Sequence, residues 1–192
     1  MSYDPPRPAG RLLLTPEDRD APARIGRLRR LGLGEHAEPA LDAFADRLAL
    51  RTGAPYAMVN FLDDKGQFFA GLHRPERDVL TVDADGNRRE VGRRLPRDHG
   101  FCPHVVVRRK ALVLEDVGDY PRFAGNPIVD EFGIRSYLGA PLIDSTGTVL
   151  GTVCVVDAEP RPWGREGLET IKASAAELVA WLERRDPEAL LP

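Results

Sequence analysis

Two short runs of the chain hold the residue types best suited to chemistry. Cys102-Pro103-His104 places a thiol and an imidazole two residues apart, and Asp98-His99 places a carboxylate beside another imidazole. Proline favours the first turn of a helix, so Pro103 predicts a helix start with Cys102 as its N-cap residue. Free backbone N–H groups at a helix start lower the pKa of a thiol and make it more reactive. Cys102 is therefore a candidate redox sensor, covalent attachment point or metal ligand, with His104 as its helper.

A structural role is the alternative for each of these residues. Free cysteine packs as a small apolar side chain, and a Cys-x-His pair without further ligands is a weak metal signal. We therefore expect no metal and no cofactor. Cys154 lies in an apolar run and is expected in the core. Asp98 and His99 could act as a general acid–base pair, but no nucleophile accompanies them at a matching spacing, so we expect no catalytic residue.

A polar cluster and a set of apolar residues flank this stretch. Asp116, Arg122 and Asn126 follow a predicted strand, where loops commonly form pockets. Arg122 could hold an anionic ligand group, or Asp116 could cap the loop with Arg122 bonded to it, which would make the cluster structural. The nearby apolar side chains could line a small-molecule cavity or form the core beneath the loop. The predicted ligand-binding residues are Phe101, Cys102, His104, Asp116, Arg122, Phe123, Asn126, Ile134 and Tyr137.

Hydrophobic spacing and turn residues predict the elements that position these side chains. Helices are expected over residues 15–31, 38–52, 103–109 and 165–185, and a loop with a short helix over 121–132. Strands are expected over residues 56–62, 67–73, 111–115, 134–143 and 148–157. The last strand is apolar on both faces, which is typical of a central strand. The charged connection over residues 74–96 is a surface insertion or a lid.

This order of elements predicts an α+β fold with an antiparallel sheet packed by helices. We expect a disordered tail over residues 1–14, a helical extension over 15–33, one domain over 34–185 and a second tail over 186–192. Thr15 and Pro16 are typical of a helix start. The apolar stripe of the last helix, which includes Ile171 and Leu178, suits packing on the first long helix or on a second copy of the chain.

Composition excludes several classes of function. The chain has 192 residues, of which 42% are hydrophobic, and a formal net charge of -3, so its overall charge does not indicate a nucleic-acid partner. It has no apolar run long enough to insert into a membrane and no secretion signal. Its 2 cysteines do not form a disulfide framework, which favours the reducing cytoplasm.

Four motifs follow one another in the second half of the chain: DHGFCPHVV, LVLEDVGDYPRFAGNPIV, IRSYLGAPLI and GTVLGTVCVVDAEPRPW. In order and spacing they resemble a bacterial GAF domain, and the likeness covers about residues 34–185. The segment RLLLTPEDRDAPARIGRLRRLGL is similar to the N-terminus of free-standing GAF proteins of actinobacteria.

The resemblance implies a GAF-like fold, related to the profilin and PAS folds. A six-stranded antiparallel sheet would carry the long terminal helices on one face. Short helices and loops, here residues 95–109 and 120–132, would roof a ligand pocket on the other face. In this family the scaffold senses small molecules, and the terminal helices often form a homodimer.

Departures from the family's motifs reduce the number of ligand classes that we expect. Members that bind cyclic nucleotides carry an Asn-Lys pair and a Phe-x-x-x-Asp-Glu signature, whereas here Asn126 stands in the place of that Phe. Bilin-binding members attach the pigment to a Cys directly followed by His, whereas here Pro103 intervenes. Free methionine sulfoxide reductases share the fold but use a set of cysteines that Cys102 and Cys154 match poorly.

We therefore expect a non-enzymatic sensory or regulatory module in bacterial signal transduction, which binds an unknown small molecule, a signalling partner protein or both. The resemblance suggests a kinase or small-GTPase system as the partner. Two alternatives stay open. One is a redox sensor or cysteine-dependent enzyme, similar to a free methionine sulfoxide reductase, that uses Cys102. The other is an interaction or dimerisation module whose pocket is filled by its own side chains.

Overall fold

The computed structural model describes residues 15–75 and 92–186. Its helices are α1 (Ala21–Arg30), α2 (Pro39–Thr52), α3 (Cys102–Arg108), α4 (Pro121–Ala124), α5 (Pro127–Phe132) and α6 (Gly164–Glu183), with a 3-10 turn η1 (Val117–Asp119). Its strands are β1 (Tyr56–Leu62), β2 (Gly66–His73), β3 (Arg94–Pro96), β4 (Leu112–Leu114), β5 (Ser136–Ile143) and β6 (Val149–Asp157). The predicted tail over residues 1–14, residues 187–192 of the second tail and residues 76–91 of the long connection lie outside the described residues.

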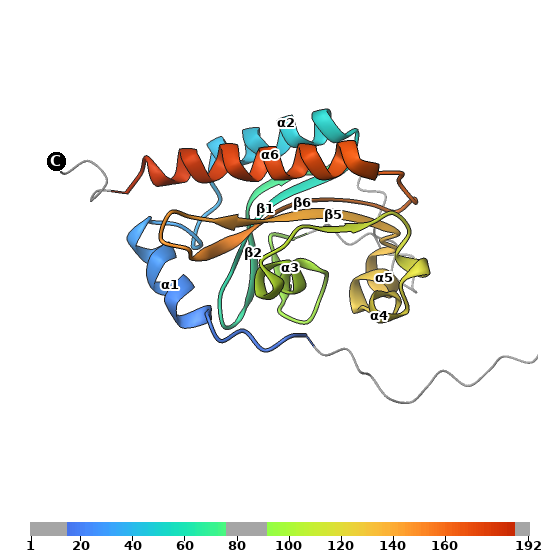
Figure 1. Ribbon diagram of the computed structural model, residues 1–192, viewed down its shortest axis with the longest axis horizontal. Helices are drawn as coiled ribbons and strands as arrows, with labels where there is room; N and C mark the ends of the chain where they lie inside the picture. The colour runs from blue at the N-terminus through green and yellow to red at the C-terminus, as the bar shows by residue number, and fades with distance from the viewer. Residues whose placement is uncertain (1–14, 76–91, 187–192) are drawn as a thin grey trace, which may run out of the picture.

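The strands form one six-stranded antiparallel sheet in the order β3-β2-β1-β6-β5-β4, which confirms the predicted α+β fold. Strands β1 and β6 lie at its centre, where Ala57 pairs with Val155. All nine residues of β6 are buried, as its two apolar faces predicted. Figure 1 shows helices α2 and α6 on one face of the sheet and α3, α4 and α5 on the other.

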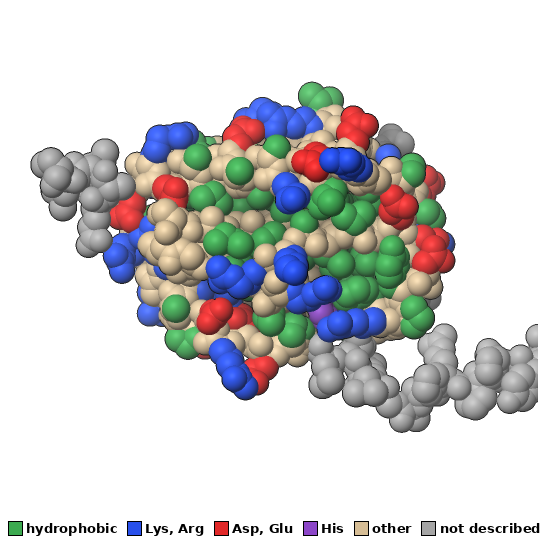
Figure 2. Space-filling model, in the orientation of Figure 1, with side chains coloured by type: hydrophobic (Ala, Val, Ile, Leu, Met, Phe, Trp, Pro, Cys, Tyr) green, Lys and Arg blue, Asp and Glu red, His purple; other side chains and the backbone are tan. Residues whose placement is uncertain are grey.

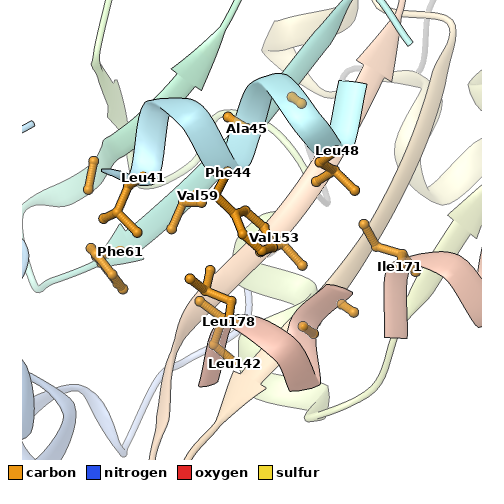
Figure 3. Packing of buried hydrophobic residues seen from close by; sticks show 14 of the residues in the cluster. Leu41, Phe44, Ala45, Leu48, Val59, Phe61, Leu142, Val153, Ile171 and Leu178 are labelled. Carbon is orange, nitrogen blue, oxygen red and sulfur yellow. The ribbon is translucent and has the colours of Figure 1, made fainter. Parts of the chain in front are cut away.

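The larger core lies between the sheet and the pair α2 and α6. Helix α2 contributes Phe44 and Leu48, helix α6 contributes Ile171 and Leu178, and the sheet side includes Val153 (Figure 3). Burying a side chain of this size stabilises the fold by about 1.5–3 kcal/mol. The apolar stripe of α6 therefore packs on the chain's own sheet, and its core residues are unavailable to a second copy.

Two glycines allow close approaches that hold this core together. A Cβ on Gly71 would collide with the backbone oxygen of Leu41, so glycine lets the start of α2 lie directly on β2. A Cβ on Gly151 would collide with the backbone oxygen of Asn60 on the neighbouring strand β1. Both contacts are with backbone atoms, which cannot swing aside as a flexible side chain can.

Helix α1 begins at Ala21, so the start predicted at Thr15 and Pro16 is wrong. Asp18, which follows these two residues, forms an ion pair with the buried Arg24 instead of lying in a first helical turn. Arg24 also donates hydrogen bonds to the backbone oxygens of Leu62 and Val149, over 3.0 and 3.3 Å. These bonds dock α1 against the ends of the two central strands.

Strand β3 was not predicted, because its three residues carry no apolar alternation. It pairs Arg94–Pro96 with the start of β2 at the edge of the sheet, and only Leu95 is partly buried. An exposed edge strand with a proline carries little of the hydrophobic pattern that sequence reading depends on.

Candidate functional site

A second apolar layer lies between the sheet and the short helices α3, α4 and α5. We refer to it as the roofed core. Its buried residues are Tyr56, Met58, Leu62, Phe69, Phe101, Cys102, Val105, Val106, Leu114, Val117, Phe123, Ile128, Ile134, Tyr137, Val149, Cys154 and Val156. Five of the predicted ligand-binding residues belong to it, namely Phe101, Cys102, Phe123, Ile134 and Tyr137. The roof therefore stands where the resemblance implied.

The aromatic side chains of the roofed core pack against one another. Phe101 contacts Phe123 and Tyr137 edge to face, with ring centroids 5.7 and 5.2 Å apart. The ring of His104 meets Phe123 in the same way at 5.1 Å. Edge-to-face pairs of this kind stabilise a fold beyond the area they bury. These rings pack together in the space under α3.

The cavity of the roofed core lies further along, beside α5. Its volume is about 30 Å³, and it is lined only by Tyr56, Met58, Phe69, Leu95, Ile128, Phe132, Ile134 and Val156. A cavity of about 10–15 Å³ already holds one water molecule, so this one has room for very few atoms. Of the predicted ligand-binding residues, Ile134 alone lines it.

Asn126 joins two segments of the roof. Its side-chain oxygen accepts hydrogen bonds from the backbone N–H of Gly100 and of Ile128, over 2.8 and 3.1 Å. Its amide nitrogen donates to the backbone oxygen of Gly100 over 2.9 Å. Asn126 thus caps α5 and fixes the loop before α3 to it, so its polar atoms face protein groups.

Asp116 and Arg122 do not form a pair. The carboxylate of Asp116 caps η1 through the backbone N–H of Gly118, at 3.0 Å, and pairs with Arg135 over 2.5 Å. The Arg135 bond and the Gly118 bond lower the pKa of Asp116. Arg122 is exposed and lies over the ring of Phe123, 5.8 Å from its centroid. The structural alternative for Asp116 stands, with Arg135 in the place expected for Arg122.

Cys102 is the first residue of α3, with Phe101 as the N-cap residue, so the predicted capping position is wrong. Its thiol points into the roofed core, where Sγ lies 3.6 Å from Cys154 Sγ and 3.4 Å from Tyr137 Oη. The hydrogen bond with Cys154 lowers the pKa of Cys102 to about 6. The same bond, together with burial, raises the pKa of Cys154 well above its usual range.

The two histidines of the roof have different surroundings. His104 is buried, and within the described part of the chain its Nδ1 has no hydrogen-bond partner. Burial, with Arg122 and Arg108 nearby, lowers its pKa to about 4, so the ring is neutral near pH 7. His99 lies between Asp98, 2.8 Å from Nδ1, and Glu131, 3.2 Å from Nε2. His99 therefore links the roof loop to α5.

A surface groove was not predicted. It runs between α6 and the outer edge of β5, beside the α3–β4 connection, and its volume is about 530 Å³. The lining residues are Arg109, Lys110, Ala111, Ala140, Pro141, Ile143, Leu168, Lys172, Ala175, Ala176 and Val179. Figure 2 shows exposed hydrophobic side chains beneath α6 with Lys and Arg around them. The signal for this groove is divided between three distant segments, so only the fold reveals it.

The groove's floor and rim differ in chemistry. Strand β4 pairs with the outer edge of β5 only as far as Gly139, because β4 begins at Leu112. This leaves Ala140, Pro141 and Ile143 as an apolar floor. The charged residues that line the groove are Arg109, Lys110 and Lys172, all cationic. A positive rim on a chain of net charge -3 marks a local feature and not the general character of the surface.

Comparison with known proteins identifies the family. The profile of the GAF domain matches residues 36–181. The chain belongs to the GAF domain family. This GAF protein is 33% identical over 150 residues to the protein named cyclic di-GMP phosphodiesterase PA2567 of Pseudomonas aeruginosa. The match covers 76% of this chain but 23% of that relative, so the chain spans about a quarter of the relative's length.

Solved structures share the fold at low identity. A GAF domain from a phosphoenolpyruvate-protein phosphotransferase of Coxiella burnetii has a TM-score of 0.57 at 19% identity and covers 90% of this chain and 99% of its own. The free methionine-R-sulfoxide reductase of Neisseria meningitidis has a TM-score of 0.59 at 15% identity, and the match covers 91% of this chain and 96% of that one. The PixJ GAF domain of Thermosynechococcus elongatus has a TM-score of 0.57 at 15% identity, and the match covers 84% of this chain and 88% of that one. A phosphotransferase domain, a reductase and a light-absorbing domain thus share this scaffold, which therefore does not decide the activity.

Two further findings concern other kinds of site. Across residues 15–75 and 92–186, no group of three or more His, Cys, Asp or Glu side chains is placed to hold a metal ion. None of the helices in these ranges is long and apolar enough to cross a membrane.

Proposed function

We propose that this chain is a non-enzymatic regulatory GAF module of a bacterial signalling system and that it acts by binding a partner protein. The supporting observation is the filled roofed core, whose cavity of about 30 Å³ is far below the ~300–1,000 Å³ of typical small-molecule sites. A ligand would have to displace packed aromatic rings. The named activity of the Pseudomonas relative belongs to a much longer protein and is not transferred to this chain.

The surface we propose for the partner is the groove beside α6. Its floor is apolar, and every charged side chain that lines it is positive, so the segment that fits it is amphipathic and acidic. Leu168, Ala175 and Val179 recur along one side of α6. That stretch is about 17 Å long at 1.5 Å per residue, enough for roughly three turns of a docked helix. The partner class that the resemblance suggests is a kinase or small-GTPase system.

Carbodiimide cross-linking, which joins a lysine amine to a carboxylate, tests this assignment directly, because the chain has three lysines, Lys65, Lys110 and Lys172. Two of them line the groove, whereas Lys65 lies on the β1–β2 turn. In cells of the source organism, we expect cross-links from Lys110 and Lys172 to an Asp- and Glu-rich segment of one partner. Lys65 should give none to that segment.

A matched pair of variants decides whether the groove carries the binding. Arg109→Glu combined with Ala176→Asp reverses the rim charge and places a carboxylate on the groove wall, while all three lysines remain. We expect loss of the partner cross-links. Arg47→Glu, on the exposed side of α2, should leave them unchanged. Cross-links that survive the groove variant, or that join two copies of this chain, would contradict the proposal.

Homodimerisation through the terminal helices α2 and α6 stays a prediction. The residues that would carry it are those on the outer faces of the helices, such as Leu50, which is 85% exposed. Ile171 and Leu178 cannot do so without opening the core, since both are buried against the sheet. Small-molecule binding also stays a prediction, and the apolar cavity beside Ile128 and Phe132 is a candidate place for it in the roofed core.

A further inference from the structure

We propose that Cys102 and Cys154 are a thiol oxidation site that closes to an intramolecular disulfide when peroxide reaches the roofed core. The inference stands apart from the proposed partner binding, because it concerns two atoms inside the fold. Both cysteines are free in the structure. Their sulfur atoms lie 3.6 Å apart although 52 positions separate them in the sequence.

The geometry places the two thiols ready to react. A disulfide bond is about 2 Å long, so the sulfur atoms must approach by about 1.6 Å. Cys102 lies on the first turn of α3, and Cys154 lies in the middle of β6. The bond would therefore join the roof to the central strand of the sheet.

The surroundings assign different roles to the two cysteines. Cys102 keeps 5% of its surface exposed and Cys154 keeps none, so an oxidant that enters from the roof meets Cys102 first. The hydroxyl of Tyr137 lies 3.4 Å from Cys102 Sγ and can donate a hydrogen bond to a thiolate there. Cys102 is thus the nucleophile that reacts with the peroxide, and Cys154 is the resolving thiol.

The reaction balances with one hydroperoxide. The Cys102 thiolate attacks a peroxide oxygen, an S–O bond forms and the O–O bond breaks, and the leaving hydroxide takes up a proton to become water. The sulfur of Cys154 then attacks the sulfenic sulfur of Cys102, and the S–O bond breaks as the S–S bond forms. The Cys154 proton leaves with the second hydroxide as water. Two thiols are oxidised to one disulfide, and one hydrogen peroxide is reduced to two waters.

The consequence is mechanical. With the disulfide closed, α3 is fixed to β6, and the roof can no longer lift away from Cys154. The chain leaves α3 at Arg109 and Lys110, which form part of the groove's rim. Oxidation of the roofed core would therefore hold one wall of the groove in place.

The test treats the folded full-length chain with hydrogen peroxide and then alkylates it under denaturing conditions. We expect the intact mass to fall by two hydrogen atoms, alkylation to be blocked at both cysteines and dithiothreitol to restore both. Peptide mapping should find Cys102 joined to Cys154 within one chain. The same treatment in urea should give a lower yield of the disulfide, because the unfolded chain no longer holds the two thiols close together.

Variants identify the order of attack. With Cys154→Ala, Cys102 should stop at the sulfenic acid and be trapped by dimedone; with Cys102→Ala, Cys154 should stay reduced at the same peroxide concentration. Wild-type protein alone decides the matter if either variant fails to fold. Two free thiols after peroxide treatment, disulfides only between separate chains, or a disulfide that forms only in urea would overturn the proposal.

Discussion

His104 is an imidazole that the fold keeps neutral. It is buried beside Phe123, its Nδ1 has no hydrogen-bond partner in the described part of the structure, and the nearest cations are Arg108 and Arg122. Burial first, and these two arginines next, oppose a positive charge on the ring. His104, which was predicted to assist Cys102, therefore packs against Phe123 as a neutral ring, and its protonation would destabilise the folded state.

This arrangement predicts a pH dependence of stability. The pKa of His104 falls from 6.5 to about 4 on folding, so below about pH 6.5 the unfolded chain binds a proton that the folded chain does not. The contribution to stability is complete above that pH and is lost as the pH falls toward 4. Between pH 7.5 and pH 5 we expect a loss of about 2 kcal/mol from this residue, measured by urea unfolding.

His104→Phe provides the control for this slope. Phenylalanine keeps a ring against Phe123 but has no proton to gain, so the variant should lose about 2 kcal/mol less between the two pH values. The carboxylates of the chain titrate in both proteins and cancel in the comparison. An identical pH dependence in the variant and the wild type would show that His104 is not the group responsible.

Residue types could be predicted from the sequence, but their partners could not. The sequence predicts Asn126 and Asp116 as polar loop residues near a pocket, and both lie in that region. Their oxygens instead accept from Gly100, Ile128, Gly118 and Arg135. A polar side chain in a loop satisfies whichever donor the fold brings near it, and that donor is far away in the sequence.

Helix α1 is the element whose docking depends most on charge. Arg24 is fully buried, paired with Asp18 and bonded to two strand-end carbonyls, and burial lowers its pKa despite these partners. Arg27, one turn later, pairs with Asp144 of the β5–β6 turn and with Asp186 beyond α6. Through Arg27, helix α1 is thus joined both to the β5–β6 turn and to the residues that follow α6.

Removal of Arg24 should therefore be costly. Arg24→Ala leaves the carboxylate of Asp18 and two backbone oxygens buried without their donor, and breaking a buried pair in this way costs about 3–5 kcal/mol. Arg29→Ala, on the exposed side of the same helix, should change the free energy of unfolding by less than about 0.5 kcal/mol. Urea unfolding measures both, and equal effects would mean that α1 is not docked through Arg24.

Elements were predictable where turn residues bracket an apolar run. Strand β1 has the predicted bounds, between Pro55 and the turn at Asp63, and α2 ends before Gly53, whose φ of 65° favours glycine. Helix α1 was misplaced because Thr15 and Pro16 carry a start signal that the Asp18–Arg24 ion pair overrides. Local sequence signals therefore predict the bounds of helices and strands, except where a contact that lies outside the local pattern changes them.

At the scale of the whole molecule, the two faces of the sheet have different characters. The face under α2 and α6 is a packed core, and the face under the roof is a second packed core with a cavity of about 30 Å³. Two larger spaces lie on the surface: the groove beside α6, at about 530 Å³, and a hollow between α1 and the β1–β2 turn, at about 640 Å³. The order of the layers could be predicted from the family's motifs, but the filling of the roof could not, since cavity volume depends on how side chains from many segments interlock.

Native mass spectrometry of the protein purified from its own cells tests the central claim, that the roofed core is filled and the groove is the working surface. We predict that the chain carries no small molecule, and that it forms a complex with a partner protein that Arg109→Glu with Ala176→Asp abolishes. The contrary result is one equivalent of a small molecule bound to the wild-type chain and retained by that groove variant. A retained ligand would place the function under the roof and not at the groove.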